Sequence, residues 1–266
     1  MAENNINKIA EKVRDDGYYV INDILNESDS EKIKNIISKY KIKNQFKHFF
    51  VNTFKFKMIE VLKLKFKKFP DINYLIKLSK RLNLNDISNK ILKKNTVLQR
   101  IDFTTHDVSN DPVVDWHVDC AFSGQKNDPK KYYHPQDFAI KFFFYLSDVD
   151  NQNGCLSYIP GSHEIGFAFK KGLYEKKFKY SPYWSLDDFV NNVKNNYKYV
   201  SNIVGEKKIN NFFQNCEIVK KEKRFDLPVK ARGAVIFDEG GIHKGNQTLK
   251  TKRIALRYFY KEKQFV

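Results

Sequence analysis

The sequence predicts an α+β fold, mainly β with helical support, built on a double-sheet jelly roll. Short β-branched or aromatic runs recur after residue 96, whereas helical patterns gather in residues 1–95. Candidate metal ligands lie on strands far apart in the chain: His117 and Asp119 on one, and His243 on a much later one. A Rossmann-type sheet would need regular strand and helix alternation and a glycine-rich turn, and the sequence has neither. The jelly roll, whose barrel mouth gathers residues from distant strands, is therefore favoured.

Composition indicates a globular chain with a strong basic bias. The 266 residues can form one large domain, and 41% of them are hydrophobic, including 23 Phe and 15 Tyr. The formal net charge of +17 suggests an anionic partner, such as nucleic acid, a membrane surface or an acidic substrate. The lysines are scattered through every segment and accompany no nucleic-acid-binding motif. A nucleic-acid role is therefore disfavoured.

Cysteine usage and hydropathy bear on the compartment. Cys120, Cys155 and Cys216 are too few and too widely spaced for a disulfide framework or a zinc site, so we expect reduced thiols. The first residues are polar, without the apolar core of a signal peptide. No run approaches the ~18 apolar residues that a membrane span requires. We expect a cytoplasmic protein without a membrane span, and no pattern indicates its oligomeric state.

Residues 1–95 are predicted to form a mostly helical layer. The first helix ends at Asp16-Gly17, a short strand follows at 18–21, a second helix begins near Ser28 or Ser30, and Pro70 marks a break. The apolar stripes of the helices are Ile6, Ile9, Ala10 and Val13; Ile33, Ile36 and Ile37; and Leu75, Leu78 and Leu82.

Residues 96–266 are predicted to form the jelly-roll core. The expected strands are 97–103, 115–119, 138–146, 234–237 and 253–260. A polar loop at 123–136 is expected to cover the mouth of the site, and 148–163 forms a turn-rich connection. Residues 172–228 are interpreted as an insertion or lid, with one helix capped at Ser185 and another beginning near Glu206. The whole chain is expected to be one domain.

The segment Asp115 to Asp119 has the geometry of a metal site. Successive side chains of a strand point to opposite faces, so His117 and Asp119 project together while Trp116 and Val118 face the other way. A histidine from a distant strand would complete a triad of two histidines and one carboxylate. Such a triad holds non-haem Fe(II) and leaves three coordination positions open.

One stretch carries a family resemblance. Residues 153–163, NGCLSYIPGSH, resemble the signature of the phytanoyl-CoA dioxygenase family, located between the His-x-Asp strand and the distal histidine. Residues 16–21 and 233–238 resemble the family's start and the strand before its last ligand, whereas about 40–95 and 172–228 match no recognised pattern. The resemblance implies a jelly-roll oxygenase that uses Fe(II), with 2-oxoglutarate and O2 as cosubstrates.

The resemblance also implies roles for individual residues. His117, Asp119 and His243 match the iron ligands, and Arg253 matches the arginine that binds the far carboxylate of 2-oxoglutarate. A guanidinium suits this role because it is planar, always charged and able to pair a carboxylate through two parallel hydrogen bonds. Some family members carry a hydroxyl residue two positions after the distal histidine; this chain has Gly245 there.

Strand parity adds weaker candidates for cosubstrate contacts. Gln99 and Arg100 point to opposite faces, so only one of them lines the pocket. Gln99 is the candidate for a second cosubstrate contact, a weaker one than Arg253. Tyr145 has a hydroxyl suited to the same purpose, although core packing is the favoured role. Asn246 is the nearest polar residue that could replace the hydroxyl missing at position 245.

Parity also places Arg257 inside the barrel together with Arg253, because the two are four positions apart. An inward cation is costly unless it is paired. Arg257 either neutralises an acid such as Asp102 or Asp238, which is slightly favoured, or holds an acidic substrate. His163 is interpreted as a structural residue of the Pro-Gly-Ser-His segment.

The expected reaction is hydroxylation of a small anionic or amphipathic substrate, with release of succinate and CO2. Asp119 disfavours halogenation, because related halogenases replace this carboxylate with a small residue that admits chloride. The 120–137 loop and the 172–228 insertion, including Trp184, are expected to contact the substrate. Two alternatives stay open: a nucleic-acid or macromolecule demethylase, marked by salt-sensitive binding, and a catalytically silent metal-binding jelly roll, marked by no consumption of 2-oxoglutarate.

Overall fold

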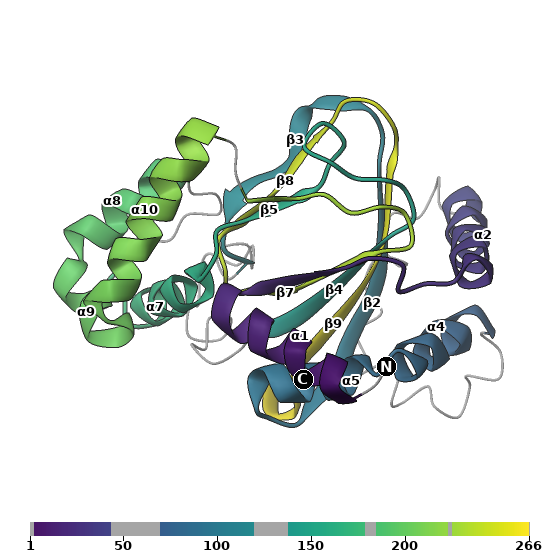
Figure 1. Ribbon diagram of the computed structural model, residues 1–266, viewed down its shortest axis with the longest axis horizontal. Helices are drawn as coiled ribbons and strands as arrows, with labels where there is room; N and C mark the ends of the chain where they lie inside the picture. Colours follow the sequence, from purple (N-terminus) through teal and green to yellow (C-terminus); the bar gives the residue numbers. More distant parts are fainter. Residues whose placement is uncertain (1–2, 44–69, 120–137, 179–184, 223–224, 266) are drawn as a thin grey trace.

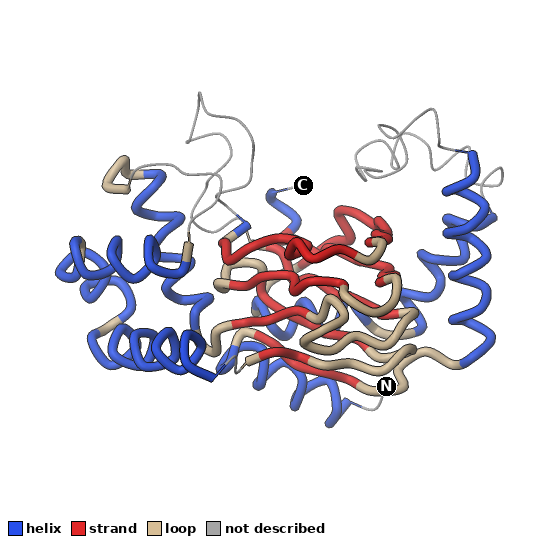
Figure 2. Tube along the Cα trace, turned by 90° about the horizontal axis from the view of Figure 1, so that it is seen from above, coloured by secondary structure: helices blue, strands red, loops and turns tan. Residues whose placement is uncertain are grey.

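The computed structural model describes residues 3–43, 70–119, 138–178, 185–222 and 225–265. In this part of the chain two antiparallel sheets pack face to face (Figures 1 and 2). The larger sheet has the strand order β1-β7-β4-β9-β2, and the smaller has the order β3-β8-β5-β6. Strands distant in sequence are neighbours in space, which confirms the jelly roll. The strands are β1 (Tyr18–Ile21), β2 (Thr96–His106), β3 (Ser109–His117), β4 (Ala139–Tyr145), β5 (Leu156–Tyr158), β6 (Asp226–Leu227), β7 (Ala234–Asp238), β8 (His243–Thr248) and β9 (Arg253–Glu262).

The sequence pattern predicted the strands of the larger sheet but missed three strands of the smaller one. β5 and β6 have three and two residues, too few to show a period. β8 contains Lys244, Gly245, Asn246 and Gln247, which are not typical strand formers. It is a strand because β3 and β5 pair with it from both sides. Tertiary pairing therefore overrides local propensity in β8.

A helical layer covers the outer face of the larger sheet (Figure 1). It consists of α1 (Glu3–Asp16), α2 (Glu27–Lys43), α4 (Pro70–Arg81) and α5 (Leu84–Leu92). The predicted stripes are buried, with Leu82 partly so, and they pack against outward residues of the sheet such as Phe142, Leu256 and Tyr258. Each fully buried side chain of this size contributes about 1.5–3 kcal/mol. Pro70 is the first residue of α4, a position where proline's missing N–H costs nothing.

A second helical group, here called the helical lobe, lies at the other side of the barrel (Figure 1). It consists of α7 (Ser162–Tyr174), α8 (Leu186–Asn195), α9 (Tyr197–Val204) and α10 (Glu206–Glu222). Ser185 caps α8 in a reciprocal capping box with Asp188, as predicted for this start, and α10 begins at Glu206. α7 crosses residue 172, where the insertion was expected to begin, and α9 was not predicted.

Three predicted features lie wholly or partly outside the described residues. Two belong to the predicted lid, the 120–137 loop and Trp184, and the third is part of the helical layer, residues 44–69. A short 3-10 helix, η3 (Lys263–Phe265), follows β9. No helix in the described ranges is long and apolar enough to cross a membrane.

Candidate active site

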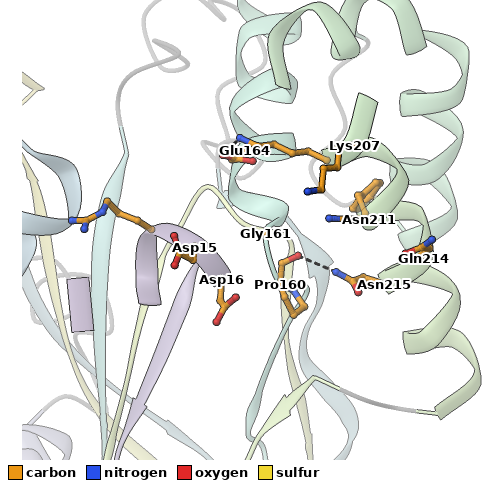
Figure 3. Close-up of a pocket in the computed structure, with 12 residues that line it drawn as sticks. Asp15, Asp16, Pro160, Gly161, Glu164, Lys207, Asn211, Gln214 and Asn215 are labelled. Carbon is orange, nitrogen blue, oxygen red and sulfur yellow. Dashed lines mark hydrogen bonds and ion pairs between the residues drawn. The ribbon is translucent and has the colours of Figure 1, made fainter. Parts of the chain in front are cut away.

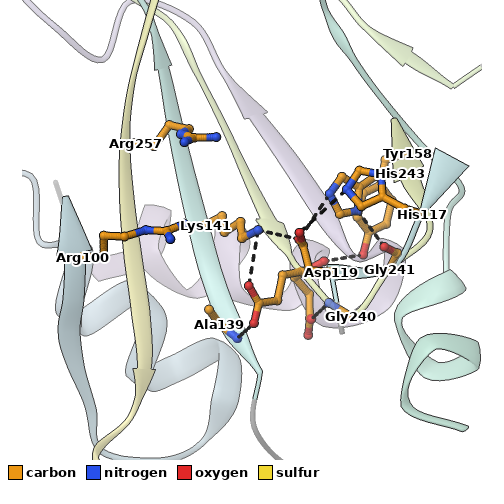
Figure 4. Close-up of polar contacts among 12 residues, drawn as sticks. Arg100, His117, Asp119, Ala139, Lys141, Tyr158, Gly240, Gly241, His243 and Arg257 are labelled. Atoms are coloured by element: carbon orange, nitrogen blue, oxygen red, sulfur yellow. Dashed lines mark hydrogen bonds and ion pairs between the residues drawn. The ribbon is translucent and has the colours of Figure 1, made fainter. Parts of the chain in front are cut away.

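The three predicted metal ligands meet at one end of the barrel (Figure 4). His117 ends β3 and pairs with His243, the first residue of β8, and Asp119 follows two residues after His117. One donor atom from each residue lies within 4.8 Å of the others. Asp119 Oδ1 is 3.7 Å from His117 Nε2, and Asp119 Oδ2 is 3.4 Å from His243 Nε2. This donor set suits a divalent transition metal.

The neighbours of the ligands have the orientation predicted by strand parity. Trp116 and Val118 are buried in the core of the helical lobe, on the side opposite to His117 and Asp119. The packing of Trp116 and Val118 in the lobe core therefore fixes the position of the His-x-Asp segment. Asp119 itself lies just beyond the last residue of β3, so the predicted strand is shorter than the ligand pair.

Backbone carbonyls determine which nitrogen of each histidine faces the centre. The His117 Nδ1–H donates to the carbonyl of Asp115 at 2.6 Å, and the His243 Nδ1–H donates to that of Gly241 at 2.8 Å. A carbonyl only accepts, so Nδ1 carries the hydrogen and Nε2 keeps its lone pair for a metal. Burial, followed by the proximity of His243, lowers the pKa of His117 to about 3. The imidazole is therefore neutral, as a ligand must be.

A buried lysine contacts the carboxylate ligand. Lys141 Nζ lies 2.5 Å from Asp119 Oδ2 and 3.3 Å from Glu239 Oε2 (Figure 4). Glu239 in turn accepts a hydrogen bond from the backbone N–H of Ala139 at 2.9 Å. Burial, the largest single influence, raises the pKa of Asp119, but the Lys141 ammonium and the two histidines together outweigh it and hold that pKa well below its usual range. Sequence reasoning did not select Lys141, although a lysine within the otherwise apolar, fully buried β4 was the available signal.

Arg253 lies inside the same barrel, and the predicted alternation of β9 is confirmed. Ile254, Leu256 and Tyr258 pack toward the helical layer, whereas Ala255 belongs to the core between the sheets. Arg253 is 3% exposed, and its Cζ is 5.4 Å from the centre of the Tyr145 ring. The arginine is thus held inside the protein, away from solvent.

Two glycines make room for Arg253. Gly154, of the Asn-Gly motif, has a φ of +74°, and a Cβ there would lie 2.9 Å from Arg253 Cδ. A Cβ on Gly245 would lie 3.4 Å from Arg253 Nη1 and 3.0 Å from Val113 Cβ. The Asn-Gly motif therefore approaches the arginine closely, and the glycine two positions after His243 faces the guanidinium directly.

The surroundings of Arg253 fit a carboxylate ligand. Arg253 Nε and the hydroxyl of the neighbouring Tyr145 are buried without a hydrogen-bond partner among the described residues, and so is the hydroxyl of Thr104, which lies opposite Ala255 in the register of β2 and β9. Buried donors of this kind are costly unless a ligand or water accepts from them. A cosubstrate with a carboxylate group would supply the acceptor. Thr104 was not predicted; it shares the inward parity of Asp102 on β2.

The other predicted residues have different surroundings. The Asn246 amide donates to Ser157 Oγ at 2.6 Å and to the Cys155 carbonyl at 3.1 Å, which speaks against the predicted cosubstrate contact. A β-bulge separates Leu98 from Arg100 at Gln99. Arg100 rather than Gln99 lies against the inward ring of Phe259, at 3.7 Å from its centre, so a cosubstrate contact of Gln99 stays a prediction.

Arg257 forms the predicted structural pair. Its Nε donates to Asp102 Oδ1 at 2.5 Å, and Asp102 is only 4% exposed. Asp238, the other predicted partner, has a different surrounding: its carbonyl accepts from the Tyr158 hydroxyl at 2.9 Å and its carboxylate from the N–H of Gly240 at 2.7 Å. Trp184, the other weak substrate candidate, lies outside the described residues.

The Pro-Gly-Ser-His segment joins parts of the fold, as predicted for His163. The His163 Nε2–H donates to the carbonyl of Arg14 at 2.9 Å, and the N–H of Gly161 donates to that of Asp16 at 2.9 Å. Ser162 Oγ accepts from the N–H of Ile242, directly before the ligand His243, at 2.8 Å. The segment therefore links α1 to the backbone that carries a metal ligand.

A surface groove of about 630 Å³ lies next to this segment, between the end of α1 and α10 (Figure 3). Pro160 and Asn215 of α10 both line it, and the Asn215 amide donates to the carbonyl of Pro160 at 3.2 Å. Its lining mixes Asp15, Asp16 and Glu164 with Lys207 and contains none of the metal ligands. The groove is therefore the boundary between the helical lobe and α1, and it is separate from the metal site.

The fold and the triad together define a class: a jelly-roll protein with a metal site of two histidines and one carboxylate. Residues 13–254 match the model of the family described as phytanoyl-CoA dioxygenase (PhyH). The chain belongs to this family and, with it, to the superfamily of Fe(II)- and 2-oxoglutarate-dependent oxygenases. A search of curated proteins gave no match.

Solved structures agree in fold at low sequence identity. A non-heme alpha ketoglutarate dependent carbocyclase, SnoK from nogalamycin biosynthesis, shares 13% identity at a TM-score of 0.58, covering 98% of this chain and 84% of that one. CytC3 with Fe(II) and alpha-ketoglutarate shares 15% identity at a TM-score of 0.55, covering 97% of this chain and 77% of that one. The epimerase SnoN, in complex with Fe3+, alpha ketoglutarate and nogalamycin RO, shares 10% identity at a TM-score of 0.50, covering 98% of this chain and 85% of that one. Identities this low establish the fold alone.

Proposed function

We propose that the protein is an Fe(II)- and 2-oxoglutarate-dependent dioxygenase that hydroxylates a small anionic or amphipathic organic molecule. One observation carries the proposal: the metal triad and a buried arginine with an unpaired donor share one barrel interior. A metal-binding protein without catalytic activity would have no reason to keep the second feature, because unpaired buried donors destabilise the fold.

Each ligand has a defined part in holding the metal. His117 and His243 would bind Fe(II) through Nε2, because their Nδ1 hydrogens are engaged by carbonyls. Asp119 would bind through its carboxylate, kept ionised by Lys141. Three protein ligands leave coordination positions for a cosubstrate and O2.

Arg253 would bind the far carboxylate of 2-oxoglutarate. Its guanidinium, with the hydroxyl of the neighbouring Tyr145, offers donors to an acceptor that the described protein does not supply. Gly245 lies next to the guanidinium, because a Cβ there would be 3.4 Å from Arg253 Nη1. The carboxylate would thus be bound in a site shielded from water, where charge-assisted hydrogen bonds are strong.

With Fe(II), 2-oxoglutarate and O2 bound, the oxidative decarboxylation of the cosubstrate supplies the oxidising power and releases succinate and CO2. The chain contributes position and exclusion of water. The rings of Phe237 and Tyr158 pack 5.2 Å and 6.2 Å from the His243 ring, and both side chains are fully buried. They form an apolar wall on one side of the metal site.

Asp119 favours hydroxylation over halogenation. Its carboxylate would take the coordination position that a chloride ion would need. The structurally similar proteins include a carbocyclase and an epimerase. The type of reaction must therefore be identified from the product. Incorporation of one labelled oxygen atom from 18O2 into the product would support hydroxylation, and a cyclised or epimerised product without label would contradict it.

The first experiment is anaerobic difference absorption of the purified protein with Fe(II), before and after addition of 2-oxoglutarate. We expect a weak visible charge-transfer band only when both are present. The band should weaken in Arg253→Ala and persist in Arg232→Ala, which removes an exposed arginine paired with Asp23. Stoichiometric iron binding without any band would contradict the cosubstrate assignment.

A further inference from the structure

Three cations converge on one inward phenylalanine next to the metal triad. The Phe259 ring centre lies 3.7 Å from Arg100 Cζ, 5.1 Å from Lys141 Nζ and 5.5 Å from Arg257 Cζ. β4, β9 and β2 are adjacent, and the register places Lys141 and Arg100 on either side of Phe259. We call Arg100, Lys141 and Arg257 the cation cluster.

The counter-charges within the cluster are unevenly distributed. Lys141 contacts two carboxylates, those of Asp119 and Glu239. Arg100 and Arg257, in contrast, share one carboxylate, that of Asp102, at 3.1 Å and 2.5 Å. A guanidinium stays charged at all ordinary pH values. In the described part of the chain, two guanidinium groups thus form ion pairs with a single carboxylate.

Among the described residues, the pairing with Asp102 leaves the terminal nitrogens of both arginines available for a ligand. Each ion pair with Asp102 uses the Nε atom of the arginine, not its terminal nitrogens. The side chains are 32% and 25% exposed, so a ligand can reach them. The terminal nitrogens of a guanidinium are the fork that binds carboxylate or phosphate groups in a bidentate manner.

The cluster lies beside the reaction centre. Lys141 spans the distance between them, because its ammonium contacts Asp119 and also lies over the Phe259 ring (Figure 4). Figure 4 shows Arg100 and Arg257 extending toward the same space from neighbouring strands. Arg253, the proposed cosubstrate residue, is separate from them. In the strand register it lies opposite His106, at the end of β2 away from Arg100.

We infer that Arg100 and Arg257 form a subsite that binds an oxyanion of the substrate, a carboxylate or a phosphate group, beside the metal centre. This inference rests on the proposed function, since it names the substrate class of the same site. The substrate is then an organic acid or a phosphate ester. The carbon that reacts lies a short distance from its anionic group.

The test uses the metal as a probe of distance. The full-length protein is loaded with Mn(II) and saturating 2-oxoglutarate, and nuclear relaxation is measured for inorganic phosphate (31P) and for acetate (1H). Mn(II) accelerates the relaxation only of anions that bind close to it. We expect saturable acceleration for at least one anion in the wild type, and the responding anion identifies carboxylate or phosphate as the preferred group.

Matched variants locate the effect. Arg100→Gln and Arg257→Gln should each weaken the binding of the responding anion by about tenfold, the loss of one charge-assisted hydrogen bond. Arg232→Gln, at an exposed arginine that also pairs with one aspartate, should behave as the wild type. Arg100→Gln leaves Asp102 paired with Arg257, so this variant carries the test if Arg257→Gln does not fold.

The outcomes separate the inference from the proposed function. Equal acceleration in all variants would mean that the anion binds the metal directly, and no acceleration in the wild type would mean that the subsite does not exist. Either result overturns the inference while the Fe(II) and 2-oxoglutarate absorption band still supports the function. A protein that binds neither Mn(II) nor Fe(II) would overturn both.

Discussion

The ammonium group of Lys141 lies 2.5 Å from the Asp119 carboxylate, although Asp119 is one of three groups arranged to bind a metal ion. A buried lysine is rare, and this one is 6% exposed. Its charge is balanced by two carboxylates, Asp119 and Glu239. Without a metal ion, the lysine is the nearby group that compensates the charge of Asp119.

This relationship predicts that Lys141→Met destabilises the metal-free protein by about 3–5 kcal/mol, because two buried carboxylates lose their partner. Saturating Mn(II) should reduce the loss, since the metal compensates Asp119. Denaturant unfolding with and without Mn(II) measures both values. Lys252→Met, at an exposed ion pair with Asp107, should cost less than about 1 kcal/mol in either condition. A loss unaffected by Mn(II) would show that Lys141 does not act through Asp119.

The position of Gly245 predicts a substitution that increases the affinity for 2-oxoglutarate. A serine there would bring a hydroxyl beside Arg253 Nη1, since the Cβ lies 3.4 Å from it. One added hydrogen bond to the bound carboxylate should tighten 2-oxoglutarate binding by about fivefold, roughly 1 kcal/mol. Titration of the Fe(II) charge-transfer band gives the affinity. Gly245→Ala, which brings the same Cβ against Val113 without a hydroxyl, is the control. Equal affinities in the two variants would reject the explanation.

His106 predicts a pH dependence of stability. Burial, and then Arg253 and Arg257, lower its pKa from 6.5 to about 4. A histidine whose pKa falls on folding binds its proton more readily in the unfolded chain, so its contribution is full above pH 6.5 and is lost as the pH falls toward 4. The free energy of unfolding of the wild type should therefore decrease over this range relative to His106→Gln. Parallel curves for the two proteins would contradict the prediction.

Two serines form a matched pair of tests. Ser162 Oγ accepts from the N–H of Ile242, and Ser185 Oγ accepts from that of Asp188. Replacing either by alanine should cost about 1–2 kcal/mol of stability. Only Ser162→Ala should also weaken Mn(II) binding, because Ile242 precedes His243. Isothermal titration with Mn(II) measures this difference, and equal affinities would show that Ser162 does not position the ligand.

The metal triad could be predicted by combining strand parity with a sequence motif. Parity places His117 and Asp119 on one face of a strand, and the resemblance of residues 153–163 identified this pair and the distal histidine as metal ligands. The alternation of β9 likewise follows from period two, and it placed Arg253 and Arg257 on one face. What one strand decides by itself was therefore within reach of the sequence.

What depends on pairing between strands was out of reach. The bulge at Gln99 arises from the register between β2 and β9, and it interrupts the period-two alternation between Leu98 and Arg100. The amide of Asn246 is engaged by Ser157, in a strand too short to show a pattern. Lys141 meets Asp119 only after β4 is placed in the other sheet. Local composition marks Lys141 as unusual in an apolar strand, but it identifies the partner residue in none of these contacts.

The Pro-Gly-Ser-His segment has a consequence for how the chain can be shortened. The segment forms hydrogen bonds to α1 through His163 and Gly161. It also forms one to the backbone next to His243 through Ser162. α1 is remote from the metal in sequence and lies on the outer face of the larger sheet, yet it shares this joint with a ligand. An expression fragment that begins at the barrel, after Asp16, would remove one side of the joint and, with it, the alignment of the distal histidine.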